Sequence, residues 1–285
     1  MRELISRKIK DSYIFTKKWN SCLNILIYLS YIIILSYILY SYYDKLEFLH
    51  ISEEQLKKLQ DEKLEKVVVY SCLIGGYDSI SSFPKEKGFN YILFTDQRIL
   101  NTNWTVLPIP KEVNDLPLTP VKKQRYIKTH PHKFFKNCEL SIYIDANYII
   151  KGNLEDFLEN TLNPLDKIYI THLQFGKTPL KAIEKAIKQK LDEKNLLNEI
   201  KKRYPPQMLN KNGIVNAGLI VRKHNDEGCI KLMEKWWEEI EKYSHVDNFS
   251  FNYAAYETGV KFLYISYQFT LDYFDHSKHL IKPNY

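Results

Sequence analysis

The apolar positions form one long run near the start of the chain and several short runs after it. No charged residue lies between Trp19 and Tyr43, and residues 23–43 read LNILIYLSYIIILSYILYSYY. As a helix this run is about 31 Å long at ~1.5 Å per residue, which matches the hydrocarbon core of a bilayer. A buried core helix is rarely apolar on every side, and the flanking aromatic residues suit a membrane interface. The run predicts a single transmembrane helix.

The charges around this run predict its orientation. Residues 1–18 carry six Lys or Arg and two Asp or Glu, a net charge of +4, whereas Asp44, Glu47, Glu53 and Glu54 follow the run. The positive-inside rule then leaves a basic tail, residues 1–22, in the cytosol and the rest on the other side. Because no small-x-small cleavage site follows the run, we expect a signal anchor, and hence a single-pass type II membrane protein.

The rest of the chain predicts a helical stem followed by one domain. Residues 44–65 are dense in charge, and Ser52-Glu53-Glu54-Gln55 has the spacing of a capping box. From residue 66 on, strand-like runs alternate with helix-like ones. We expect strands at 67–74, 91–96, 140–150, 168–173, 214–221 and 261–266, and helices at 125–135, 180–203 and 229–242. Over 66–285 this alternation predicts an α/β domain with a Rossmann-like, mixed and mostly parallel sheet and flanking helices.

Composition and charge exclude several classes of protein. Hydrophobic residues make up 45% of the chain, and 22 Tyr, 14 Phe and 4 Trp rule out a disordered chain. The four cysteines are scattered without a C-x-x-C pair, which supports neither a zinc ribbon nor a disulfide framework. The net charge is +7, and +4 of it belongs to residues 1–18, so +3 remains for the rest. Nucleic acid is therefore not an expected partner.

Two oxygen-bearing side chains interrupt the apolar strand 140–150. Asp145 and Asn147 stand at i and i+2, where a parallel sheet binds its ligands, and two such oxygens can share one hard divalent cation. A strand end with a plain turn is the alternative. Gly75 and the neighbouring Tyr77 follow the first strand, where glycine allows a base or ribose to approach the backbone closely. Asp96 closes the second strand and is a candidate acceptor for a base N–H.

Basic residues and a histidine complete the set of candidates. Arg125, Lys128 and Lys133 precede the carboxylate strand, where they are placed to face a diphosphate, although a solvated helix face is the alternative. The C-terminal segment carries His276, a possible metal ligand, and Lys282, a possible phosphate partner.

In this order, the motifs resemble a known family. The segments that carry the resemblance are YSCLIGGYD, YILFTDQ, PHKFF, SIYIDANYII, NAGLIVRKHND, KWWEEI and DNFSFNY. They are similar to the glycosyltransferase-like domain family of plant and bacterial proteins that includes mucilage-related and turgor-regulation proteins, within the GT-A nucleotide-diphospho-sugar transferases. The resemblance covers most of residues 67–285. It implies a glycosyltransferase that uses Mn²⁺ or Mg²⁺, a nucleotide-diphosphate sugar as donor and a glycan or glycolipid as acceptor.

The resemblance also implies roles for particular residues. Asp145 and Asn147 occupy the position of the D-x-D motif that holds the metal ion, and His276 completes that site in an H-x(5)-K-P tail. Asn216 occupies the position of the Asn in an N-x-G motif that faces the donor sugar. In the same tail Lys282 binds phosphate, and His279 is a possible third metal ligand.

Near the reacting centre, Asp247 and Asn248, followed by Asn252, resemble a D-Q-x-x-x-N pattern. Two positions depart from the family's patterns. Asn147 replaces the second Asp and removes a negative charge, so we expect weaker metal binding, and Asn248 replaces Gln. The implied chemistry is departure of a diphosphate stabilised by a cation and by Lys or Arg, followed by attack of an acceptor hydroxyl. Inversion would need a side-chain base beside that hydroxyl, whereas retention can proceed with few protein groups. Asp247 is the candidate for either role, and both outcomes stay open.

Two other classes compete with this reading. One is a non-catalytic, membrane-anchored glycan-binding module in which Asn147 marks loss of the metal. The other is a nucleotidyl- or phosphotransferase on a similar sheet. The transferase hypothesis also requires that the nucleotide sugar is available on the side of the membrane where the domain lies. A Golgi or ER lumen meets this requirement in a eukaryote, whereas a bacterial source places the protein in the inner membrane with its domain in the cytosol.

Overall fold

The computed structural model describes residues 26–43, 66–173, 178–210 and 213–277. The chain divides into two units, Met1–Ile51 and Ser52–Tyr285, and each is described by itself. Several predictions lie outside the described residues: the basic tail 1–22, the stem 44–65, and the roles of His279 and Lys282.

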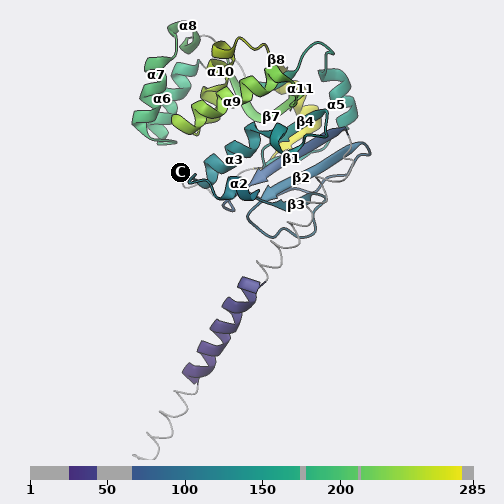
Figure 1. Ribbon diagram of the computed structural model, residues 1–285, viewed down its shortest axis with the longest axis vertical. Helices are drawn as coiled ribbons and strands as arrows, with labels where there is room; N and C mark the ends of the chain where they lie inside the picture. Colours follow the sequence, from purple (N-terminus) through teal and green to yellow (C-terminus); the bar gives the residue numbers. More distant parts are fainter. Residues whose placement is uncertain (1–25, 44–65, 174–177, 211–212, 278–285) are drawn as a thin grey trace, which may run out of the picture. The chain divides into compact units, whose positions relative to one another are not determined.

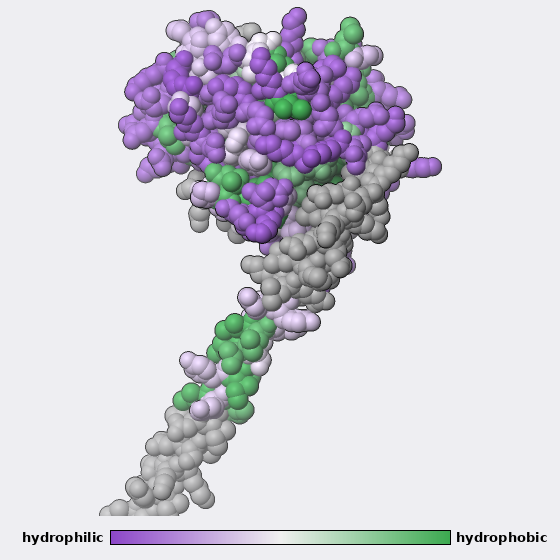
Figure 2. Space-filling view, viewed as in Figure 1, coloured by the Kyte–Doolittle hydropathy of each residue, from purple (hydrophilic) through white to green (hydrophobic). Residues whose placement is uncertain are grey.

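In the first unit, Leu26–Tyr43 forms a helix that is exposed along its whole length. Its 18 residues span about 27 Å at ~1.5 Å per residue. Within the described ranges it is the helix that is long and apolar enough to cross a membrane, by length and composition. Figure 2 shows that its surface is mostly hydrophobic, whereas the visible face of the second unit is mostly hydrophilic.

The second unit is built on a seven-stranded sheet with the order β3-β2-β1-β4-β7-β6-β8. Its strands are β1 (Val67–Leu73), β2 (Phe89–Thr95), β3 (Thr105–Pro108), β4 (Leu140–Ile144), β6 (Ile168–Leu173), β7 (Ile214–Arg222) and β8 (Leu263–Ser266). All neighbouring strands are parallel except β7, which runs antiparallel to both β4 and β6. The mixed, mostly parallel sheet expected from the sequence is therefore confirmed.

Helices cover both faces of this sheet, which explains why β1 and β4 are apolar on both faces. On one face lie α3 (Pro120–Thr129), α9 (Glu227–Lys242) and α10 (Phe251–Thr258); on the other lie α5 (Leu154–Thr161) and α11 (Tyr267–Tyr273) (Figure 1). Trp236 of α9 is fully buried in the first of these cores, and Phe157 of α5 is fully buried in the second. The predicted flanking helices are thus confirmed.

Two of the expected helices are broken. Residues 180–203 form α6 (Pro179–Gln189) and α7 (Lys194–Arg203), because Lys190 takes a left-handed conformation with a φ of 54°. The two helices pack with the short α8 (Pro206–Leu209) around a small core of their own. Residues 125–135 divide between α3 and α4 (Pro131–Phe134), since the residue before a proline disfavours the helical conformation. The short helix α2 (Lys111–Asn114) precedes α3.

The expected strand 140–150 is also interrupted, and this break shapes the site. β4 ends at Ile144, and a turn closed by a hydrogen bond from Tyr148 N to Asp145 O leads into β5 (Tyr148–Ile150). β5 leaves the main sheet and pairs antiparallel with β9 (Phe274–His276). The turn therefore carries Asp145 and Asn147, and the pairing brings His276 beside it.

Candidate active site

The order of the strands reverses at β1. From β1 the chain proceeds outward through β2 to β3, and then returns to place β4 on the other side of β1. Open α/β sheets bind ligands beyond the carboxyl ends of their strands at such a reversal. Gly75 and Tyr77 follow β1, Asp96 follows β2 and Asp145 follows β4. The fold brings these four candidates to one edge.

Asp145 is held by the residues around it. Tyr143 donates its hydroxyl hydrogen to Oδ1 of Asp145 over 2.8 Å, and the backbone N–H of Asp145 donates to Gly218 O over 2.9 Å. Lys128 Nζ lies 3.4 Å from the same Oδ1. Among the described residues these side-chain contacts all use Oδ1, and the side chain is 31% exposed.

Asn147 directly precedes β5, and His276 is the last residue of its partner strand β9. Asn147 Nδ2 donates to Ser277 O over 3.4 Å, and Ser277 N donates to Asn147 O over 2.8 Å. His276 lies opposite Tyr148 in the ladder, with 4.1 Å between the ring centroids. Burial lowers the pKa of His276, while the negative charges of Asp275 and Asp145 oppose that shift. The structure therefore brings His276 within electrostatic reach of Asp145, and burial favours the neutral imidazole, which is the form that coordinates a metal.

Asn216 is fixed at the start of β7, next to this turn. Its Nδ2 donates to Tyr148 Oη over 3.1 Å, and its Oδ1 accepts a hydrogen bond of the same length from Gly218 N. Position 218 requires glycine, because a Cβ there would lie 2.7 Å from the Tyr148 ring. Asn248 Oδ1 accepts from Ala217 N over 3.1 Å. These bonds join β7, the turn after β4 and the segment around Asp247.

Asp247 begins η1 (Asp247–Phe249) and is buried between two cations. Its Oδ2 lies 2.7 Å from Lys128 Nζ and 3.1 Å from Arg125 Nε. Burial opposes ionisation of this carboxyl, but Arg125 and Lys128 outweigh burial and lower its pKa. The Asp247 carboxylate therefore favours its ionised form, and its negative charge is paired with Lys128 and Arg125.

Lys128 and Arg125 both come from α3, and they differ in access to solvent. The Lys128 side chain is 1% exposed, whereas that of Arg125 is 17% exposed. Burial disfavours the charged form of Arg125, but Asp247 and Asp145 raise its pKa above the ordinary value. Arg125 can thus meet a bound anion directly, whereas Lys128 acts through the carboxylates that it contacts.

The loop after β1 is tied to the end of β2. Both carboxylate oxygens of Asp96 accept from Gly75 N, over 3.1 and 3.2 Å, and Gly75 has a φ of 87°, a conformation that suits glycine. Burial raises the pKa of Tyr77, with Arg125 lowering it and Asp145 raising it. Tyr77 therefore lies within electrostatic reach of Arg125 and Asp145.

Lys133 belongs to a different cluster. Its Nζ lies 3.3 Å from Glu234 Oε1 and donates to Tyr126 Oη over 3.1 Å. His130 and His132 contact the same carboxylate of Glu234, over 3.2 and 3.1 Å. Of the three basic residues expected to face a diphosphate, Lys133 is the one that is paired elsewhere.

Two supporting groups of residues were missed by sequence analysis. Gln124 Nε2 donates to Tyr143 Oη over 2.8 Å, which directs the Tyr143 hydroxyl toward Asp145. The one signal in the sequence was a tyrosine within an apolar strand, two residues before Asp145.

The second group fixes the end of α3. The buried Arg222 donates to Tyr70 Oη and to Lys128 O, and Tyr70 donates to the same carbonyl over 2.8 Å. These bonds hold the turn of helix that carries Lys128. A charged residue at the end of the apolar run 214–221 was the available signal.

Asp145, Asn147 and His276 are the residues near this edge that could hold a hard divalent cation. Asp145 would offer a carboxylate oxygen, Asn147 an amide oxygen and His276 an imidazole nitrogen. Within the described ranges, no three His, Cys, Asp or Glu side chains are grouped to hold a metal ion. A cation at this edge therefore depends on Asn147 as one of its ligands.

Comparisons with known proteins identify similar folds. No protein-family model matches the chain, and no curated protein matches its sequence. Among solved structures, the chain is similar to mouse xyloside xylosyltransferase 1 in its apo form, with 12% identity, a TM-score of 0.40, and coverage of 70% of this chain and 84% of that one.

Two further similar structures are also glycosyltransferases. The apo structure of the WbbM bifunctional glycosyltransferase shares 13% identity at a TM-score of 0.41, over 70% of this chain and 39% of that one. The galactosyltransferase LgtC in complex with donor and acceptor sugar analogs shares 10% identity at a TM-score of 0.38, over 65% of this chain and 70% of that one.

Proposed function

We propose that this chain is a membrane-anchored glycosyltransferase that moves a sugar from a nucleotide-diphosphate sugar to a glycan or glycolipid. The observation that carries the proposal is the convergence of Asp145, Asn216 and His276 at the edge where the strand order reverses. They come from three separate elements and belong to one network through Tyr148 and Gly218. Such an edge is where nucleotides bind to this class of sheet.

Asp145, Asn147 and His276 are the residues that would hold Mn²⁺ or Mg²⁺. When bound, such an ion supplies positive charge to stabilise a departing diphosphate. Arg125 adds a second positive charge on the same side, since its partly exposed guanidinium contacts Asp247 and feels the charge of Asp145. We propose that Gly75, Tyr77 and Asp96 line the position of the base and ribose, because they follow β1 and β2 at this edge.

Asn216 is proposed to face the donor sugar, because its side chain is fixed at both ends by Tyr148 and Gly218. A preorganised amide of this kind orients a sugar hydroxyl without reorganising during the reaction.

Asp247 is proposed to act by positioning charge. A base must accept a proton in the reaction, and a carboxylate whose pKa two cations lower is poorly suited to that task. Its ion pairs instead fix Arg125 and, through Lys128, the Oδ1 side of Asp145. Removal of the Asp247 charge is thus expected to disturb the site as a whole.

The proposed anchor is the helix Leu26–Tyr43, in a type II orientation. The sequence motifs support the GT-A transferases and, within them, the mucilage-related and turgor-regulation type of domain. In a eukaryote the domain would work in a Golgi or ER lumen; in a bacterium the protein would lie in the inner membrane with the domain in the cytosol.

A glycan-binding module without activity is the main alternative. Isothermal titration of the full chain in lipid nanodiscs with UDP, with and without Mn²⁺, separates the two. We expect UDP affinity that rises when Mn²⁺ is added, and loss of this rise in Asp145→Asn. The same titration with GDP covers the second common base. If the chain binds neither UDP nor GDP, or if Mn²⁺ does not change its affinity for them, the proposal is contradicted.

A further inference from the structure

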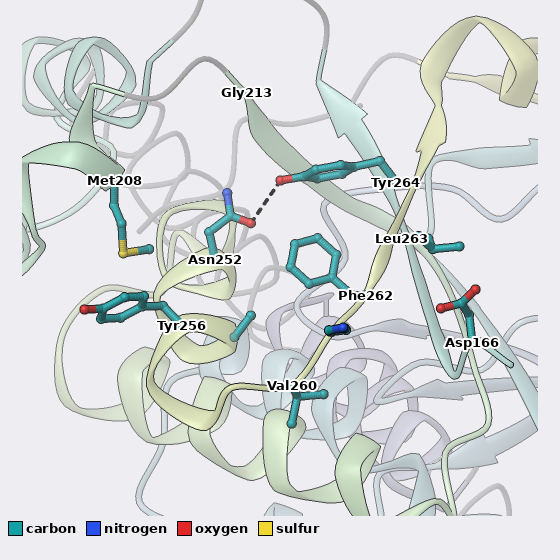
Figure 3. A pocket seen from close by; sticks show the side chains of 11 residues that line it. Asp166, Met208, Gly213, Asn252, Tyr256, Val260, Phe262, Leu263 and Tyr264 are labelled. Atoms are coloured by element: carbon teal, nitrogen blue, oxygen red, sulfur yellow. Dashed lines mark hydrogen bonds between the residues drawn. The ribbon is translucent and has the colours of Figure 1, made fainter.

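A groove outside the donor edge lies along the edge strand β8. Its volume is about 430 Å³, within the range of small-ligand sites. Figure 3 shows Tyr264 of β8 and Phe262, which precedes that strand, on one side of Asn252 of α10, with Met208 and Tyr256 on the other. Asp166, Gly213, Ala255, Val260, Lys261 and Leu263 complete the lining.

Exposed apolar side chains of the domain gather at this groove. Over the described residues from 66 on, five large hydrophobic side chains are exposed, and three of them, Tyr256, Leu263 and Tyr264, line it. Tyr256 is 56% exposed and Tyr264 is 47% exposed. A fourth, Leu165, is next to Asp166 in the sequence. Aromatic side chains kept in water at one place indicate a binding surface.

The chemistry of the lining points to a neutral, hydroxyl-rich ligand. Tyrosine rings present a flat apolar face with a polar tip, which suits the C–H face and the hydroxyl rim of a sugar ring. The Asn252 amide offers both a donor and an acceptor, and its Oδ1 accepts weakly from Tyr264 Oη, over 3.4 Å. The charged lining residues, Asp166 and Lys261, have opposite signs, so the groove selects neither an anion nor a cation.

The elements that line the groove adjoin elements of the candidate active site. Asn252 belongs to α10, which begins two residues after η1, the segment that starts at Asp247. In the sheet, Ile265 of β8 lies opposite Thr171, and Thr171 lies opposite Asn216. Neighbouring strands are ~4.8 Å apart, so about 10 Å separates Tyr264's strand from that of Asn216. A chain of sugars covers such a distance, whereas one sugar does not.

We propose that this groove binds a neutral glycan chain, as the part of the acceptor that lies away from the reacting sugar. The inference rests on the proposed glycosyltransferase function, because it assigns the groove to the acceptor of that reaction. The aromatic faces of Tyr256 and Tyr264 carry the contact, and the Asn252 amide fixes its orientation.

The test is binding of neutral hexasaccharides to the full chain in lipid nanodiscs, which avoids sugar-based detergents. The probes are cello-, xylo-, manno-, malto- and chitohexaose with the matching monosaccharides, measured by calorimetry. We expect at least one hexasaccharide to bind and its monosaccharide to bind much more weakly. Tyr256→Ala and Tyr264→Ala should each weaken binding by about tenfold, which is ~1.4 kcal/mol. Leu100→Ala, at another exposed apolar position, is the matched control and should change nothing.

Release of nucleoside diphosphate from donor sugars, measured on the same samples without acceptor, separates this inference from the proposed function. Tyr256→Ala should leave that release unchanged. Donor turnover without hexasaccharide binding, or binding that neither tyrosine variant weakens, overturns the groove assignment and leaves the transferase intact. A dimer that Tyr264→Ala dissociates and that no hexasaccharide competes with overturns it too, in favour of a second copy of the chain. Absence of donor turnover instead refutes the proposed function.

Discussion

Asp247→Asn tests the central ion pairs of the site. The substitution removes a carboxylate that is 6% exposed and lies 2.7 Å from a lysine that is 1% exposed. Removing one partner of a buried ion pair costs about 3–5 kcal/mol, because the other charge stays buried without compensation. Asparagine keeps the shape of the side chain and one acceptor oxygen. We therefore expect a cost at the lower end of this range, a loss of about 3 kcal/mol in the free energy of unfolding. In a domain of this size that lowers Tm by roughly 6–12 °C.

Denaturant unfolding of the full chain in nanodiscs, followed by tryptophan fluorescence, measures this loss. Trp236 Nε1 donates to Asp247 O over 3.1 Å, which makes it a local reporter. Asp145→Asn is the matched control, and we expect a loss of about 1 kcal/mol or less because Asp145 is 31% exposed. Adding Lys128→Met to Asp247→Asn should recover more than half of the loss. A loss no larger than that of the control, or no recovery in the double variant, refutes the reasoning.

Four further predictions follow from the same structure. Asn147→Asp should tighten Mn²⁺ binding in a titration by adding a second anionic oxygen, and unchanged affinity would remove Asn147 from the ligand set. Gly218→Ala should abolish donor turnover, since its Cβ would meet the Tyr148 ring at 2.7 Å, and unchanged turnover would show that this turn tolerates a side chain. Deletion of residues 1–43 should give a domain that melts cooperatively without detergent; aggregation of that variant alone would count against the predicted boundary. Burial lowers the pKa of His224 to about 4, whereas in the unfolded chain it is ~6.5. Between these two pH values the unfolded chain binds a proton at His224 that the folded chain does not. Stability should therefore fall as pH drops from ~6.5 to about 4, by up to about 3 kcal/mol, and His224→Gln should flatten that fall in pH-dependent melts.

Much of the sheet could be predicted because its buried strands are continuous apolar runs. β1 and β4 are apolar on both faces, and the alternation of strands and helices predicts their parallel pairing. The direction of β7 could not be predicted, since an apolar run reads the same in a parallel and an antiparallel strand. Four-residue β3 and three-residue β9 are too short to give a periodic signal.

The candidate site divides in the same way. Asp145 and Asn147 could be found because they interrupt an apolar strand, and the break between β4 and β5 falls at these residues. The ion pairs of Asp247 could not, because α3 and η1 are more than a hundred residues apart in the sequence and only the tertiary fold brings them together. Gln124 and Arg222 were missed for the same reason: their partners are set by tertiary structure.

Product analysis after incubation with nucleotide sugars tests the central claim most directly. The full chain in nanodiscs is incubated with Mn²⁺ and a panel of UDP- and GDP-sugars, and the products are separated by mass. The account predicts release of the nucleoside diphosphate, with the sugar set free or joined to an acceptor, and loss of this release in Asp145→Asn. Release of a nucleoside monophosphate with a sugar phosphate would instead identify cleavage within the diphosphate, and no release from any donor would leave the chain without the proposed activity. Either result contradicts the claim that this chain transfers sugars.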